Sequence, residues 1–253
     1  MVIAIGNGFT LNVGTGSLSA SNAISLTVPT GATLNVSTGN VFLASLNVSG
    51  TGTFNCSGAA TIIPWGDVSI TSPNFSAGTS TFYQKYSTKT ISSTQPLYNY
   101  TVGTGSGTDY DIAITLQSNL TVLNNFTIQY VAGKTRSFNA GSYTLNIGGN
   151  FTNNDTFTPG TSTVNFNDAT NVSTISGSTT FNNLTSSTPD KTIKFTAGTT
   201  QTVSSLSLTG TSGHLITIDT DTGAGTFNLS DTTGTNTLYY TSVTRSAAAG
   251  GAT

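Results

Sequence analysis

The chain has 253 residues and a net charge of −2, too small a charge to direct it to nucleic acid or to an acidic membrane surface. Charged residues make up only 6 % of the chain, serine and threonine together make up about a third, and Phe, Tyr, Val and Ile are plentiful. Disordered chains carry more charge and fewer aromatic and β-branched residues, so this composition excludes disorder and favours β-strands.

The first ten residues, MVIAIGNGFT, lack the basic segment of a secretion leader, and the chain has no apolar run of the length that spans a membrane. We therefore expect no secretion leader. We also expect this run to cap the first coil of the fold, because a stack of strands leaves an open edge at each end.

Short apolar–polar alternations follow one another along the chain. Residues 33–37 read TLNVS, residues 45–49 read SLNVS and residues 53–57 read TFNCS, and similar segments recur as far as 226–230. Each has period two and therefore one apolar face, and Gly, Asn or Ser separates it from the next. No window has the 3.6-residue period of an amphipathic helix, so the sequence predicts an all-β fold.

The only cysteine, Cys56, has no partner for a disulfide within the chain. It follows Phe54 by two residues, which places both side chains on one face of the predicted strand. We expect Cys56 to be a buried small hydrophobic residue.

Residues 61–73 depart from the alternating pattern, and we predict an irregular loop there, after an N-terminal section over 1–60. The stretch holds the only tryptophan, Trp65, between a proline and a glycine. Trp65 is a candidate for stacking on a sugar ring or for anchoring a neighbouring chain. The alternative is a hydrophobic plug over the core.

A long sequence segment occurs twice in the chain. Residues 80–101 read STFYQKYSTKTISSTQPLYNYT, and residues 162–185 read STVNFNDATNVSTISGSTTFNNLT. A repeat of short strands favours a stacked solenoid over a sandwich or a barrel, with about 20–25 residues in each coil. Thr, Ser and Asn then form hydrogen-bonded ladders between equivalent positions of successive coils. We predict a duplicated solenoid over 74–253 with a flexible C-terminal end.

The segment 98–112 combines a Gly/Ser/Thr run with clustered tyrosines. We expect a projecting loop, with Tyr98, Tyr100 and Tyr110 as further candidates for contact with a ligand or a partner.

Three sequence segments in the second half of the chain resemble a known class of protein. They are YTLNIGGNFTNN (143–154), KTIKFTAGTTQTVSSLSLTG (191–210) and YYTSVTRSAAAGGAT (239–253). Together with the repeat they resemble the repeats of large secreted or surface-displayed β-helical adhesin-like proteins, over roughly residues 74–253. The resemblance implies a right-handed parallel β-helix and an exterior structural or adhesive role. Phage fibres and spikes are similar in architecture.

Catalytic groups are scarce. Glycoside hydrolysis needs two carboxylates across a cleft, and the sequence has no Glu. The pairs Asp109–Asp111 and Asp219–Asp221 each have the spacing of one strand face. His214 is the only histidine, and no nucleophile-elbow motif accompanies it. We predict no enzymatic activity.

Neither a metal nor a cofactor is predicted. The acidic turn 219–225 lacks the distal Glu of a calcium loop, and the Gly-rich run 103–107 lacks the lysine of a phosphate-binding loop.

The sequence thus favours a non-enzymatic structural β-solenoid in an exterior fibre or decoration of a phage virion, where it aids attachment to a host surface. We expect a homo-oligomer, with a trimer as our estimate, and contacts to other virion or surface proteins and to cell-surface glycans. Two alternatives stay open: a segment of a bacterial or archaeal cell-surface adhesin or extracellular filament, and a polysaccharide-degrading β-helix enzyme. All three place the protein on a virion exterior or outside the cell.

Overall fold

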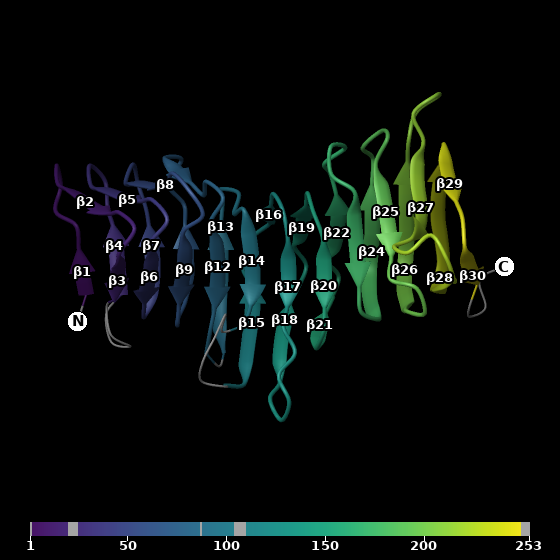
Figure 1. The fold of residues 1–253 in the computed structure, drawn as a ribbon, viewed down its shortest axis with the longest axis horizontal. Coiled ribbons are helices and arrows are strands. Elements are labelled where there is room, and N and C mark those ends of the chain that lie inside the picture. The colour runs from purple at the N-terminus through teal and green to yellow at the C-terminus, as the bar shows by residue number, and fades with distance from the viewer. Residues whose placement is uncertain (1, 20–24, 87, 104–109, 249–253) are drawn as a thin grey trace. The chain divides into compact units, whose positions relative to one another are not determined.

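The computed structural model describes residues 2–19, 25–86, 88–103 and 110–248. Within them the chain is all-β without a helix, and parallel strands stack as a β-solenoid of about ten turns, which confirms the predicted fold class (Figure 1). The same residues include no helix with the length and apolar character needed to cross a membrane. The chain divides into two compact units, one of Met1–Thr121 with Tyr130–Phe138 and one of Val122–Gln129 with Asn139–Thr253.

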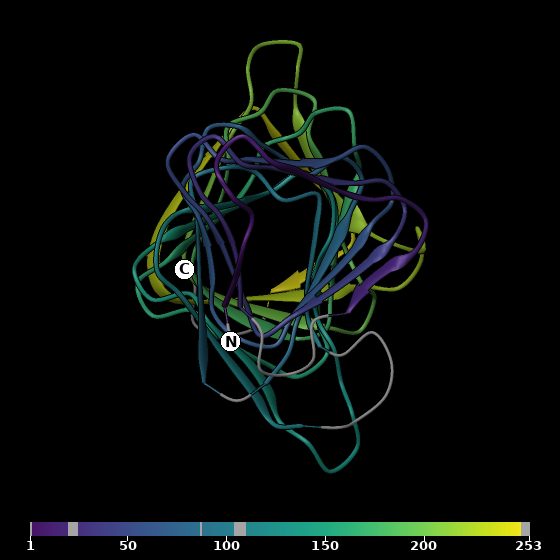
Figure 2. The same cartoon turned by 90° about the vertical axis from the view of Figure 1, so that its left-hand side faces the viewer.

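In the first unit successive strands visit three sheets in turn. One sheet has the order β1 (Val2–Ala4), β4 (Ser25–Val28), β7 (Ser45–Val48), β10 (Val68–Ile70), β13 (Lys89–Ser93) and β15 (Ile112–Leu116). The second has β2 (Thr10–Val13), β5 (Thr33–Val36), β8 (Thr53–Cys56) and β11 (Phe75–Ser76). The third has β3 (Ser17–Ser19), β6 (Asn40–Leu43), β9 (Thr61–Pro64), β12 (Thr81–Gln84) and β14 (Asn99–Val102). In the end-on view the purple-to-blue turns of this unit overlie one another (Figure 2).

The second unit is built mainly from two sheets. One has β17 (Phe126–Ile128), β20 (Phe151–Asn153), β23 (Ser173–Ser176), β25 (Thr192–Phe195), β27 (Ile216–Thr220) and β29 (Thr241–Val243). The other has β19 (Thr144–Ile147), β22 (Thr163–Phe166), β24 (Thr179–Ser186), β26 (Thr200–Thr209), β28 (Phe227–Tyr239) and β30 (Ser246–Ala248). β18 (Arg136–Asn139), most of which belongs to the first unit, follows β15 in the first sheet described above. The other two strands are β16 (Leu120–Val122) and β21 (Thr156–Thr158). In this second sheet β24, β26 and β28 lengthen to 8, 10 and 13 residues.

The coil length centres on the predicted 20–25 residues but varies more widely, from 18 residues between Thr81 and Asn99 to 28 between Thr200 and Asn228. Hydrogen bonds between successive turns span 20 residues from the Ser72 hydroxyl to the Gly52 backbone carbonyl, 23 from Asn35 to Asn12, and 26 from Asn153 to Thr179. Pairing is parallel and in register: Thr33 lies beside Thr53 and Leu34 beside Phe54. In this pair of strands, each residue therefore stacks on a neighbour of similar kind.

The inward positions form a continuous apolar core. In β5, Leu34 and Val36 are fully buried, whereas Thr33 and Asn35 between them are partly exposed. Phe54 and Cys56 both point inward, as their spacing predicts, and burial raises the pKa of the Cys56 thiol to about 12. The thiol is consequently a packing group and not a nucleophile.

The outward positions form the predicted polar ladders. The amide of Asn35 donates to Oδ1 of Asn12 at 2.8 Å, and the amide of Asn165 donates to Oδ1 of Asn146 at 2.9 Å. Uncharged side chains suit this position because equal charges on adjacent strands would repel.

The stretch 61–73 continues the stack, where the sequence had suggested an irregular loop. It contains β9 and β10, which pair in parallel with β6 and β7. Pro64 is the last residue of β9 and has no amide hydrogen to donate, but its carbonyl accepts a hydrogen bond from the Lys85 amide at 3.1 Å. The tip of the expected loop over 98–112, residues 104–109, and the expected flexible end at 249–253 lie outside the described residues.

Candidate functional site: an aromatic pocket in the first unit

Trp65 is positioned by the end of β9. Pro64 points inward, so the next side chain points outward, and the Trp65 amide donates to the carbonyl of Leu43 at 2.8 Å. Gly66 then allows the chain to pass close to the preceding turn, because a Cβ at this position would lie 2.1 Å from the carbonyl oxygen of Ala44. The indole is therefore held at a fixed place on the outside of the solenoid.

Tyr86 lies against the Trp65 indole. It follows β12, and its φ of 82° puts a bulky residue in the left-handed region that favours glycine. Its ring stacks on Trp65 with centroids 5.4 Å apart and an interplanar angle of 25°. Its ring also lies 4.5 Å from that of Tyr110, and a hydrogen bond to Tyr110 raises the pKa of Tyr86. Three aromatic side chains from three separate parts of the sequence thus meet in one cluster.

Two lysines accompany the aromatic rings. The ammonium of Lys85 lies 5.4 Å from the centroid of the Trp65 ring, close enough for a cation–π contact. The side chain of Lys85 is buried, and this burial lowers its pKa. Among the described residues neither Lys85 nor Lys89 forms an ion pair with a carboxylate.

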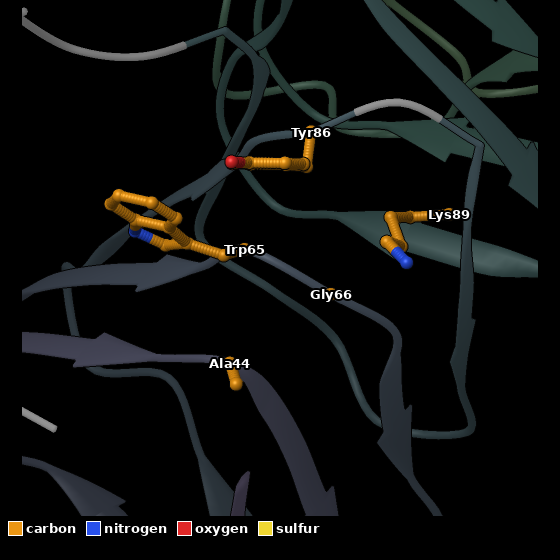
Figure 3. Close-up of a pocket in the computed structure, with 5 residues that line it drawn as sticks. All are labelled: Ala44, Trp65, Gly66, Tyr86 and Lys89. Carbon is orange, nitrogen blue, oxygen red and sulfur yellow. The ribbon is translucent and has the colours of Figure 1, made fainter. Parts of the chain in front are cut away.

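An open pocket of about 290 Å³, which we call the aromatic pocket, lies beside this cluster. It is lined by Ala44, Trp65, Gly66, Tyr86 and Lys89. In Figure 3 Trp65 and Lys89 lie on opposite sides of the pocket, with Tyr86 above and Gly66 and Ala44 below. The pocket therefore combines aromatic surface on one side with a positive charge on the other.

The four predicted contact residues separate into three groups. Trp65 and Tyr110 meet in the aromatic cluster through Tyr86. Tyr98 is half-buried and does not line the aromatic pocket. Tyr100 is 0 % exposed, so its prediction as a contact residue is wrong.

The burial of Tyr100 has a clear physical reason. It occupies an inward position of β14 beside Phe82 of β12, and its hydroxyl donates to Oε1 of Gln84 at 2.5 Å. A buried tyrosine needs such a partner for its hydroxyl. Burial also raises the pKa of Tyr100 well above its usual value, so the residue is a neutral part of the core.

The sequence prediction missed Tyr86, Lys85 and Lys89. The available signal was the run QKYSTK over 84–89, where two lysines and a tyrosine interrupt the alternation that ends β12. Charge is scarce elsewhere, so this concentration beside an aromatic residue was informative. Its proximity to Trp65 follows only from the stacking of β12 on β9.

The second unit carries a different polar pair. Nδ1 of His214 and Oδ2 of Asp190 lie 2.8 Å apart, and the two side chains are 60 % and 61 % exposed. A carboxylate that orients an imidazole is one part of a hydrolytic triad. Among the described residues no hydroxyl or thiol is recorded within hydrogen-bonding distance of the other ring nitrogen. The pair is therefore an exposed imidazole–carboxylate contact of small energetic weight.

No family model, curated protein or solved structure matches this chain. The β-helical repeat architecture is observed, whereas membership of an adhesin family or of a phage fibre family stays a prediction. Within the described residues no group of three or more His, Cys, Asp or Glu side chains lies close enough to hold a metal ion.

Proposed function

We propose that this chain is a non-enzymatic structural β-solenoid in an exterior fibre or decoration of a phage virion, and that it contributes to attachment at a host surface. The protein is then located on the outside of the particle, in contact with other virion proteins and with the surface glycans of the host.

The observation that carries this proposal is the character of the outward strand positions. They bear Thr, Ser and Asn side chains that hydrogen bond to their equivalents in the next turn, as Asn35 does with Asn12 and Asn165 with Asn146. Each ladder ties adjacent turns together without charge, and it leaves a hydrophilic surface outside a core of large apolar side chains. Such a surface suits a rigid scaffold that is exposed to solvent.

The aromatic pocket supports the attachment role. Aromatic side chains that offer an apolar face beside a polar group are common at binding surfaces. A pocket on the outside of a stacked scaffold is held by several turns at once, so its residues are positioned before a ligand arrives.

We also propose that the chain acts as a homo-oligomer, with a trimer as the predicted state, because association covers open strand edges. Light scattering on the purified full chain measures this directly. A mass near three chains supports the trimer, and a mass of one chain at working concentrations contradicts the oligomer.

Labelling of intact particles tests the location. Antibodies raised against the purified chain are applied to gradient-purified virions and, separately, to intact host cells, and both are imaged by electron microscopy. Label on the outside of the virions supports the proposal. Label confined to the cell surface overturns the virion role and favours the adhesin alternative.

Incubation of the chain with host capsule or exopolysaccharide tests the non-enzymatic part. We expect no new reducing or unsaturated ends. Their appearance in time and in proportion to protein would overturn this part of the proposal and favour a polysaccharide-degrading enzyme.

A further inference from the structure

We propose that the aromatic pocket binds an acidic sugar, of the hexuronate class, within a surface polysaccharide. This inference rests on the proposed function in one respect, since it names the ligand class for the attachment role. The residues that carry it are Trp65, Tyr86 and Lys89, with Lys85 as a second positive charge.

The aromatic side of the pocket fits a sugar ring. A pyranose ring has a face of C–H groups that packs on aromatic rings, and the rim of the ring carries its polar groups. Trp65 lines the pocket, and Tyr86, which packs between Trp65 and Tyr110, lines it beside the indole and fixes the orientation of that ring. The volume of about 290 Å³ lies at the small end of ligand pockets, which suits one sugar residue of a longer chain.

The charge in the pocket selects an acidic sugar. The Lys89 side chain lines the pocket, and the Lys85 ammonium lies over the Trp65 ring. Neither lysine has a carboxylate partner among the described residues, so both ammonium groups suit an incoming carboxylate. A charge-assisted hydrogen bond between an ammonium and a carboxylate is roughly twice as strong as a neutral one. A neutral sugar lacks this bond, and a cationic ligand is repelled by both lysines.

Backbone strain is concentrated at the same place. Tyr86 has a φ of 82° and Thr88 a φ of 49°, both in the left-handed region. Non-glycine residues in this region are uncommon and tend to cluster at ligand-binding sites, where the surrounding structure holds them. Here the strained residue is the one that brings its ring against Trp65 and over the pocket (Figure 3).

The only tryptophan of the chain lines this pocket, so its fluorescence reports on the site directly. The experiment titrates the full-length chain with tetragalacturonate and tetraglucuronate, and with maltotetraose as a neutral comparison, while Trp65 emission is recorded. We expect a saturable change with at least one of the uronates and none with maltotetraose at equal concentration. Added salt should weaken the binding.

Two matched lysine variants separate the site from general electrostatics. Lys89→Gln removes the positive charge in the aromatic pocket. Lys134→Gln removes a positive charge elsewhere, because Lys134 is half-exposed and does not line the aromatic pocket. We expect Lys89→Gln to weaken uronate binding about 10-fold or more, as loss of one hydrogen bond to a charged group does, and Lys134→Gln to leave it unchanged. Calorimetry with Trp65→Ala gives a readout that does not depend on the fluorophore, and it should detect no uronate binding.

Four results would overturn the inference: no saturable change with any uronate, equal binding of maltotetraose, equal loss in both lysine variants, or full competition by inorganic phosphate at the same concentration. None of these results bears on the proposed location on the virion, because labelling of virions tests that location without any ligand. Conversely, uronate binding by a chain that is found on cells would keep this inference and overturn the virion role.

Discussion

The side-chain amide of Asn183 donates a hydrogen bond to Oγ1 of Thr163 at 3.3 Å, from β24 to the neighbouring β22. The amide of Asn99 makes the same bond to Oγ1 of Thr81 at 3.2 Å, from β14 to β12. These two pairs occupy corresponding positions in the two copies of the repeated segment, residues 80–101 and 162–185. The repeat therefore encodes a contact between consecutive turns and not only a strand pattern.

We predict that this contact is worth about 0.5–1.5 kcal/mol in each copy, the usual net value of one hydrogen bond. A double-mutant cycle with Asn183→Ala and Thr163→Val, followed by urea unfolding, measures it. The cycle with Asn99→Ala and Thr81→Val is the matched comparison and should give the same coupling energy within about 0.5 kcal/mol. A coupling of zero in both copies would show that the ladders do not tie the turns together.

Two glycines test how closely successive turns approach. A Cβ at Gly52 would lie 2.2 Å from the carbonyl oxygen of Val28, whereas one at Gly14 has no atom within 4 Å. We predict that Gly52→Ala lowers the free energy of unfolding by about 1–3 kcal/mol, because backbone atoms must move to accommodate it. Gly14→Ala should be neutral or stabilising by up to about 1 kcal/mol, because it restricts the unfolded chain. Equal effects in urea unfolding would mean that the close approach is relieved at little cost.

Most of the core could be predicted from the sequence, because period two in a strand decides which side chains share a face. Leu34, Val36, Phe54 and Cys56 all lie inward as the alternation requires. The outward ladders could be predicted for the same reason, since in-register parallel stacking places like residues side by side.

The aromatic pocket could be predicted only in part. Trp65 and Tyr110 were recognisable as aromatic residues at breaks in the pattern, but the residue that joins them, Tyr86, depends on a backbone conformation that its side chain does not favour. Tyr100 was misjudged because a tyrosine suits either a surface or a core. Its buried position depends on Gln84, a hydrogen-bond partner 16 residues away that nothing in the local sequence identifies.

The conformation of Tyr86 leads to a prediction about stability. Tyr86→Ala removes the ring contacts with Trp65 and Tyr110 but keeps a Cβ at a φ of 82°. Tyr86→Gly removes the same contacts and also the strain, which is about 1–2 kcal/mol for a left-handed residue. We predict that the glycine variant is more stable than the alanine variant by about 1 kcal/mol or more in urea unfolding. The reverse order would mean that Tyr86 is not strained, and it would remove one support of the sugar site.

Lys191 is a fully buried lysine in the second unit, and its environment makes stability depend on pH. Its ammonium donates to the backbone carbonyls of Asp168 and Asn171, both at 2.7 Å, and to that of Gly148 at 3.3 Å. Burial lowers the pKa of Lys191 from its ordinary 10.5 to about 8. The folded chain therefore releases this proton at a lower pH than the unfolded chain does.

Between about pH 8 and 10.5 the unfolded chain binds more protons at this site than the folded chain, so the free energy of unfolding rises with pH. We predict a contribution from Lys191 of about 2 kcal/mol between roughly pH 7.5 and 9.5. This range lies below the ordinary tyrosine pKa of about 10. At higher pH, ionisation of Tyr100 in the unfolded chain lowers the free energy of unfolding, because burial raises the pKa of Tyr100 in the folded chain.

Urea unfolding of the wild type and of Lys191→Met at several pH values in this range isolates the contribution, because every other titrating group is common to both proteins. The variant should be less stable than the wild type at both ends of the range, since the three carbonyls lose the Lys191 donor. It should also lack about 2 kcal/mol of the wild-type rise with pH. Lys194→Met, which removes a partly exposed lysine of β25, is the control and should keep the wild-type slope. If Lys191→Met keeps that slope as well, the Lys191 ammonium does not lose its proton in this range and the carbonyls hold it charged.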